Sequence, residues 1–148
     1  MHTSNIPFQV APLETVVVYC SDGRFGDQTE EFLNRNLGLK RYDRLVVPGG
    51  AACLTGYHPS HMQDEGIFAQ LRFLIEAHAL KRVVLIAHDD CGYYKLRLGV
   101  TPKQQDQPKR DDLVKAAENI RNINPQCEVQ TYIARLNNNE VYFDEVRL

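Results

Sequence analysis

Three short runs of β-branched and aliphatic residues punctuate the chain. They span Thr15 to Cys20, Leu45 to Val47 and Val83 to Ala87. A continuous apolar run of this length is typical of a strand that is buried on both faces, as in a parallel sheet. The pattern therefore predicts three central strands within one domain covering residues 1–148, a length that suits a single core.

Apolar residues at helical spacing lie between these runs. A first helix is expected to begin at Asp27, with Glu30 three residues later completing a capping box, and to end at Gly38. A second helix is expected to begin near Asp64, and its apolar face includes His78, which we expect to be a core residue with its hydrogen bonds satisfied.

The C-terminal third predicts one more helix and a hairpin. The helix is expected from about Asp111 to just before Asn124, which precedes a proline. Val129 to Ile133 and Val141 to Val146 flank a run of three asparagines, a pattern that indicates two strands joined by a turn. The segment from Gly99 to Pro108 is rich in polar residues and is expected to be a surface loop.

This alternation of strands and helices predicts an α/β fold with a central, mostly parallel sheet flanked by helices and a C-terminal hairpin strand. In such sheets, ligands bind beyond the carboxyl ends of the strands, where the strand order reverses. Cys20 ends the first strand, and His88 and Cys91 follow the third. If those two strands are neighbours, in the order 2-1-3-4, the three side chains converge at the point of reversal.

Two cysteines and one histidine at such a point are three of the soft ligands that Zn²⁺ prefers. Cys20, His88 and Cys91 are therefore the predicted metal ligands, and a fourth position remains for water or for the carboxylate of Asp22. Zinc with an open position makes a nucleophile from water at neutral pH, which favours an enzyme over a scaffold. A purely structural zinc would need Asp22 as its fourth ligand.

Charged residues beside these ligands predict a switchable site. Asp22 can accept a hydrogen bond from a metal-bound water, and Arg24 can hold Asp22 with its guanidinium fork. With Asp22 bound to Arg24, the fourth position on the zinc would be open to water. With Asp22 bound to the zinc, that position would be closed. Asp89 and Asp90 are expected to orient His88 or to serve a proton path.

Other candidate groups favour ordinary structural roles. Cys53 and Cys127 are expected to be small core residues. The segment Cys91 to Arg97 has the Cys-x5-Arg spacing of a thiol phosphatase. A phosphate cradle needs small residues, however, and Tyr93 and Tyr94 are better suited to packing.

Composition excludes several classes of function. The formal charge of −2, with scattered basic residues, gives no indication of nucleic-acid binding. No apolar stretch is long enough to span a membrane, and the first residues do not resemble a secretory signal, so a cytoplasmic location is expected. The polar segment from Thr55 to Asp64, with His58 and His61, is expected to be a solvated loop.

The paired motifs Cys20-Ser-Asp22-Gly-Arg24 and His88-Asp-Asp-Cys91-Gly resemble the zinc signature of the β-class carbonic anhydrases, in particular the compact members with short termini. The resemblance extends over most of the chain. It implies zinc on the two cysteines and the histidine, and Asp22 and Arg24 as a catalytic dyad. It also implies a lyase that hydrates carbon dioxide reversibly to bicarbonate through zinc-bound hydroxide, in a homodimer or a dimer of dimers.

One departure from that family bears on the substrate. The turn Gly49-Gly50-Ala51 is expected to border the pocket, and Val47-Pro48 precedes it where the family commonly has Arg-Asn. A changed pocket wall leaves two alternatives open. One is a zinc hydrolase of a related small molecule, carbonyl sulfide or carbon disulfide. The other is a non-catalytic zinc-binding module of the same fold.

Overall fold

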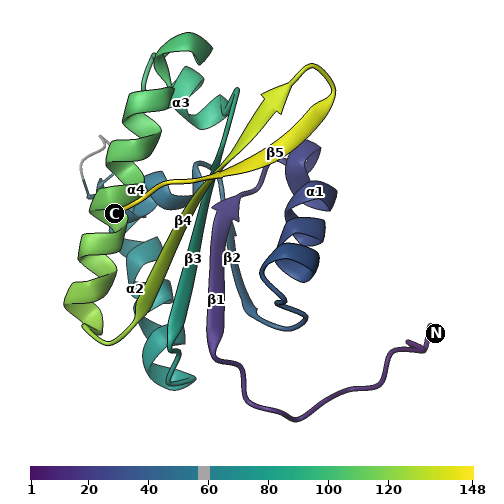
Figure 1. Ribbon diagram of the computed structural model, residues 1–148. Coiled ribbons are helices and arrows are strands. Elements are labelled where there is room, and N and C mark those ends of the chain that lie inside the picture. The colour runs from purple at the N-terminus through teal and green to yellow at the C-terminus, as the bar shows by residue number, and fades with distance from the viewer. Residues whose placement is uncertain (57–60) are drawn as a thin grey trace.

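A five-stranded sheet forms the centre of the protein (Figure 1). The computed structural model describes residues 1–56 and 61–148, and it describes side chains for all of these except residues 61–63. The strands are β1 (Thr15–Cys20), β2 (Asp43–Val47), β3 (Arg82–His88), β4 (Glu128–Asn137) and β5 (Glu140–Glu145). Their order is β2-β1-β3-β4-β5, with the first four parallel and β5 antiparallel to β4, which confirms the predicted fold class.

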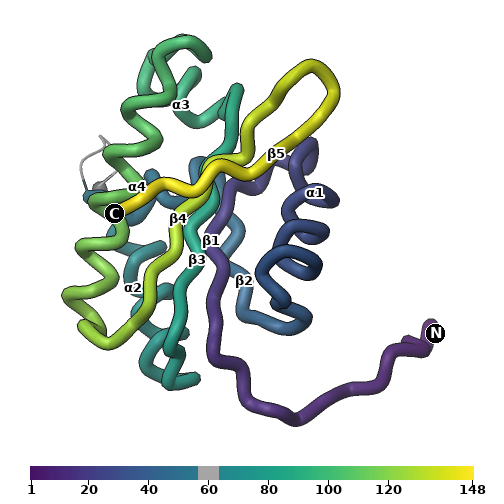
Figure 2. The backbone as a smooth tube through the Cα atoms, in the orientation of Figure 1, coloured from purple at the N-terminus to yellow at the C-terminus, as the bar shows by residue number. Residues whose placement is uncertain are grey.

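Helices cover both faces of this sheet, α1 on one side and α2 and α4 on the other (Figures 1 and 2). The helical segments are η1 (Gly23–Phe25), α1 (Gly26–Glu31), the π-helical turn η2 (Phe32–Asn36), η3 (Gly50–Leu54), α2 (His61–Ala77), α3 (Gly92–Arg97), η4 (Pro102–Gln104) and α4 (Asp106–Ile123). This layering explains why the middle residues of β1 and β3 are all apolar.

Alternate residues of the central strands face opposite layers, as the period of two in a strand requires. Val16 and Val18 belong to the core beneath α2 and α4, together with Leu85 of β3. Val17 and Val84 belong to the core beneath α1 and η2. All five are completely buried, so the middle of β1 and of β3 is shielded from solvent on both faces.

The strand order reverses at β1, which lies between β2 and β3. Within the parallel β1–β3 pair, Tyr19 is opposite Ile86, and within the β1–β2 pair, Cys20 is opposite Val47. The carboxyl ends of the two central strands therefore lie side by side. His88 is the last residue of β3, so it reaches the same edge of the sheet as Cys20.

The start of α1 differs from the sequence prediction. Its N-cap residue is Phe25, and no side chain caps it, so the capping box of Asp27 and Glu30 is wrong. The Glu30 carboxylate instead accepts hydrogen bonds from Tyr42 (2.5 Å) and Arg44 (3.3 Å). Side chains distant in sequence therefore donate to this carboxylate in place of the backbone N–H groups at the start of α1.

The prediction that His78 is a core residue is wrong. α2 ends at Ala77, so His78 lies beyond the segment to which the helical spacing applies. The His78 side chain is exposed, and its Nδ1 atom lies 2.6 Å from a carboxylate oxygen of Asp43 at the start of β2.

The predicted surface loop from Gly99 to Pro108 is wrong in its second half. α4 begins at Asp106, five residues before the predicted Asp111, and η4 precedes it. Gln105 is completely buried although it lies in a polar stretch. The segment packs against the carboxyl end of β3, a contact that composition does not reveal.

Part of the predicted loop from Thr55 to Asp64 lies outside the described residues. His58 falls in the gap between the two described ranges. His61 is the first residue of α2, and its side chain is not among those described.

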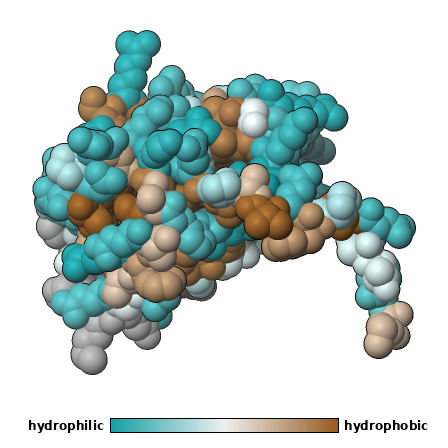
Figure 3. Space-filling model, turned by 90° about the horizontal axis from the view of Figure 1, so that it is seen from below, coloured by the Kyte–Doolittle hydropathy of each residue, from teal (hydrophilic) through white to brown (hydrophobic). Residues whose placement is uncertain are grey.

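The N-terminal segment has no regular secondary structure before β1. It projects away from the layered body, as Figures 1 and 3 show. Ile6, Phe8 and Val10 are largely exposed along it.

Replacing Leu85 with Ala is expected to lower the free energy of unfolding by about 2–5 kcal/mol, because the leucine is fully buried in the central strand. The matched control is Leu96→Ala on α3, where the leucine is 84% exposed and the expected change is within about 0.5 kcal/mol. Urea unfolding measures both. Equal losses in the two variants would contradict this assignment of the core.

Candidate metal centre

Cys20 places its sulfur at the point where the strand order reverses. The Gly49 backbone N–H donates a hydrogen bond to Cys20 Sγ over 3.3 Å. Such a donor favours the thiolate over the thiol. The sulfur of Cys91 lies 3.9 Å from the same Sγ atom, although 71 residues separate the two cysteines in sequence.

His88 is buried and held in one orientation. Its Nδ1 atom lies 2.8 Å from the backbone carbonyl of Asp89, and since a carbonyl can only accept, Nδ1 carries the proton. The ring of Phe25 lies against the imidazole, with centroids 4.4 Å apart. The Nε2 atom is buried and has no hydrogen-bond partner within the described part of the chain. In this tautomer Nε2 carries a lone pair, which is the form that binds a metal ion.

The structure brings the three sequence-predicted ligands together. One ligand atom from each of Cys20, His88 and Cys91 lies within 4.8 Å of the other two. Two Zn–S bonds of ~2.3 Å at a tetrahedral angle would separate the sulfurs by about 3.8 Å. The Sγ–Sγ separation here is 3.9 Å, so the pair fits zinc without rearrangement.

The two thiols differ in acidity because they contact each other. The hydrogen bond with Cys91, aided by the Gly49 N–H, lowers the pKa of Cys20 to about 4 against the opposing effect of burial. The same contact with Cys20, together with burial, raises the pKa of Cys91. A divalent cation at this position would replace the shared proton and stabilise both sulfurs as thiolates.

Two glycines bring the end of β2 against the end of β1. Gly49 has a φ of +86°, and a Cβ atom there would lie 2.6 Å from Cγ of Tyr93. A Cβ atom on Gly50 would lie 3.0 Å from the backbone nitrogen of Cys20. Of the three residues expected to border the pocket, Gly49 bonds to a predicted ligand, whereas Ala51 lies in the core beneath α2 and α4.

Asp22 and Arg24 form a closely bonded pair. Arg24 donates from Nε and Nη2 to the two carboxylate oxygens of Asp22, at 3.0 and 2.6 Å, and from its backbone N–H as well. These side-chain hydrogen bonds, against a smaller effect of burial, lower the pKa of Asp22 to about 2. Arg24 also donates to the carboxylate of Asp90, over 3.1 Å. Asp22 is thus held on arginine, and it is not part of the close group formed by the three ligand candidates among the described residues.

The two acidic residues between His88 and Cys91 have different roles. Asp89 orients the imidazole through its backbone carbonyl rather than its carboxylate. Its carboxylate points instead to Lys109 (2.5 Å). Sequence reasoning missed Lys109 and Gln105, because a lysine or glutamine in a polar helix start carries no signal of burial.

Comparison with known proteins places the chain in a family. Residues 13–143 match the family described as "Putative carbonic anhydrase". The chain belongs to this family. An uncharacterized protein of Rickettsia conorii is 28% identical over 127 residues, which cover 82% of this chain and 67% of that protein.

Solved structures of carbonic anhydrases share the fold. The β-carbonic anhydrase isoform I of Trichomonas vaginalis superposes with a TM-score of 0.55 at 16% identity, covering 95% of this chain and 87% of that one. The tetrameric β-carbonic anhydrases of Sordaria macrospora give a TM-score of 0.54 at 14% identity, covering 93% and 82%. At such low identity the likeness extends to the fold, which is β-carbonic-anhydrase-like.

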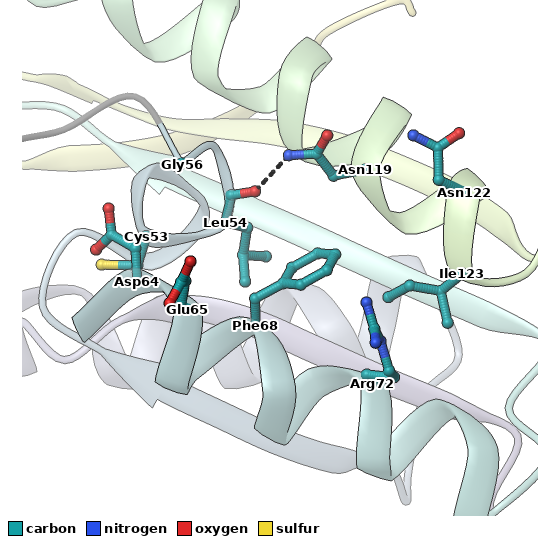
Figure 4. A pocket seen from close by; sticks show the side chains of 10 residues that line it. All are labelled: Cys53, Leu54, Gly56, Asp64, Glu65, Phe68, Arg72, Asn119, Asn122 and Ile123. Carbon is teal, nitrogen blue, oxygen red and sulfur yellow. Dashed lines mark hydrogen bonds between the residues drawn. The ribbon is translucent and has the colours of Figure 1, made fainter. Parts of the chain in front are cut away.

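A cavity of about 300 Å³ lies between α2, η3 and α4 (Figure 4). Cys53 is on its wall, and its thiol donates to the carbonyl of Pro48 over 3.1 Å. None of the lining residues is Cys20, His88 or Cys91.

Among the described helices, none has the length and apolar character that a membrane span requires.

Replacing Cys20 or Cys91 with Ser is expected to weaken Co²⁺ or Zn²⁺ binding by more than about 100-fold, since contacts around a ligand alone are worth about 10- to 100-fold. The sulfur-to-cobalt charge-transfer absorption should fall in both variants. Cys127→Ser is the matched control, because Cys127 is buried like Cys91 but belongs to the core. Loss of the absorption in the control, or its retention in the Cys20 and Cys91 variants, would contradict the ligand assignment.

Proposed function

We propose that this carbonic anhydrase family member is a zinc lyase that reversibly hydrates carbon dioxide to bicarbonate. Cys20, His88 and Cys91 are the proposed zinc ligands. The observation that carries the proposal is the buried Nε2 atom of His88, without a hydrogen-bond partner among the described residues, beside two sulfurs 3.9 Å apart. A buried nitrogen lone pair without a donor is costly unless a metal ion occupies the space.

Zinc bound there would supply Lewis acidity and a water-derived nucleophile at neutral pH. The two thiolates bring negative charge that neutralises the ion, so a helping group must orient the reacting water. Asp22 is suited to accept a hydrogen bond from that water. Arg24 holds the Asp22 carboxylate in its ionised, accepting form, and Asp90 holds the other side of Arg24.

The contact between Asp22 and Arg24 favours an enzyme over the alternative of a non-catalytic zinc module. In such a module, Asp22 would be the fourth zinc ligand. The carboxylate instead receives hydrogen bonds from Arg24 on both oxygens, which leaves the fourth position for water and substrate. The hydrolysis of carbonyl sulfide or carbon disulfide would use the same ligands and remains an outcome for the test.

Replacing Asp22 with Asn in the zinc-loaded protein is expected to lower the rate of CO₂ hydration by about 100-fold, because a neutral amide oxygen is a weaker hydrogen-bond acceptor than a carboxylate. Stopped-flow hydration measures the rate, and metal analysis confirms equal zinc content. Asp27→Asn, in the exposed first turn of α1, is the matched control and should retain the wild-type rate. Equal rates in wild type and Asp22→Asn would end the proposed role, and faster turnover of carbonyl sulfide than of CO₂ would favour the hydrolase.

We expect the protein to act as a homodimer or a dimer of dimers. The Sordaria macrospora enzymes of the same fold are described as tetrameric. Val46 on the edge strand β2 and Phe8 in the projecting N-terminal segment are exposed apolar residues that a second copy could cover. Sedimentation equilibrium should give a mass of two or four chains, and a monomer at micromolar concentration would contradict the expectation.

A further inference from the structure

The start of α4 presents two buried polar side chains to the ligand turn, which we define as residues His88 to Cys91. Gln105 is 0% exposed and Lys109 is 1% exposed. They are four residues apart, with the Lys109 N–H donating to the Gln105 carbonyl over 3.1 Å, so their side chains leave the same face of the helix. The zinc proposal assigns neither residue a role.

Gln105 holds the backbone of Cys91 from both sides. The Cys91 N–H donates to the Gln105 side-chain oxygen over 3.1 Å, and the Gln105 amide donates to the Cys91 carbonyl over 3.3 Å. The same amide reaches the carbonyl of Val100 over 3.4 Å. The Gln105 side-chain amide thus bonds to the Cys91 backbone as a neighbouring strand would. The two bonds fix the peptide groups on either side of the Cys91 side chain.

Lys109 acts on the other end of the ligand turn. Its ammonium group lies 2.5 Å from a carboxylate oxygen of Asp89. The Leu136 N–H donates to the second oxygen over 3.2 Å, and Arg135 approaches the first at 3.4 Å. Held by these three donors, Asp89 cannot rotate freely. Its backbone carbonyl therefore stays where it receives the Nδ1–H of His88.

Burial of these two side chains needs a reason beyond packing. A buried ammonium group loses its hydration and is tolerated only when it is closely paired. Between the two ligands the turn also contains Asp90 with a φ of +51°, a left-handed conformation that is unfavourable for a residue other than glycine. A turn of this kind keeps its shape only when its surroundings hold it.

We propose that Gln105 and Lys109 are positioning residues that preorganise His88 and Cys91 for a divalent metal ion. Gln105 sets the sulfur ligand through the Cys91 peptide groups, and Lys109 sets the imidazole through Asp89. The inference rests on the proposed function for the identity of the ion, zinc. Its consequence, a metal affinity that depends on the first turn of α4, can be measured without any assay of catalysis.

The experiment measures Zn²⁺ affinity of the full chain by competition with a chromophoric chelator, and the d–d spectrum of the Co²⁺ form. The variants are Gln105→Met and Lys109→Met, which preserve length and remove hydrogen bonding or charge. Each has a matched control on the same helix. Gln107→Met removes an exposed glutamine that bonds to Asp111, and Lys115→Met removes a lysine that pairs with Glu118 at the surface.

Both test variants are expected to bind Zn²⁺ about 10- to 100-fold more weakly than wild type, as is usual when a partner of a ligand is lost. The Co²⁺ spectrum should shift, because the ligand angles are no longer held. The two controls should keep wild-type affinity and spectrum. Wild-type affinity in Gln105→Met and Lys109→Met, or an equal loss in the controls, would overturn the proposal.

A double substitution removes the ambiguity that Lys109→Met alone could fail to fold. Asp89→Asn with Lys109→Met removes both charges, so no unpaired charge remains in the interior at this contact. This protein is expected to unfold cooperatively in its metal-free form and still to bind Zn²⁺ about 10-fold or more weakly than wild type. With Asp89→Asn measured alone as well, the losses in affinity of the single Asp89→Asn and Lys109→Met variants should be non-additive in the double variant, because both act on one contact. Additive losses would show that Lys109 does not act through Asp89.

The two proposals fail separately. A wild-type protein that binds Zn²⁺ tightly but does not hydrate CO₂ would end the proposed function, and the affinity comparison would still decide the role of α4. Normal hydration together with unchanged affinity in Gln105→Met and Lys109→Met would end the role of α4 alone.

Discussion

The parallel pairing of β1 with β3 is the constraint on which the site depends. This register sets Tyr19 opposite Ile86, and the apolar side chains of both strands pack into the two cores, one on each face of the sheet. With the register set, Cys20 and His88 arrive at one edge of the sheet. The sulfur–sulfur separation of 3.9 Å between Cys20 and Cys91 follows from that pairing and from the short turn after β3.

Around this edge, backbone groups contribute as much as side chains. The Gly49 N–H bonds to the Cys20 sulfur, and the Asp89 carbonyl bonds to the His88 ring. Each needs a chain conformation that most residues avoid: a left-handed glycine after β2 and a left-handed Asp90 after β3. The ligand candidates are thus held by two turns with left-handed residues, and buried contacts from α4 support the turn after β3.

Two environments separate the acidic residues of the site by function. Asp22 is bonded to the guanidinium of Arg24, which lowers its pKa and keeps the carboxylate ionised. Asp89 is bonded to the buried Lys109, which leaves its carboxylate no freedom to take part in chemistry. This difference supports the proposed role of Asp22 beside the reacting water, and the role proposed for Asp89 in the geometry of the turn.

Much of this architecture was predictable from sequence because it depends on local periodicity. Apolar β-branched runs define the central strands, and the rule that ligands bind at the reversal of strand order is enough to bring Cys20, His88 and Cys91 together. The same reasoning failed at His78, which lies just beyond the last residue of α2 and faces solvent instead of the core. It also failed at Gln105 and Lys109, whose polar character suggested solvent. Only the tertiary structure decided their burial, because a polar side chain is stable in the interior when distant parts of the chain supply its hydrogen-bond partners. The sequence around Gln105 and Lys109 does not show which distant residues those partners are.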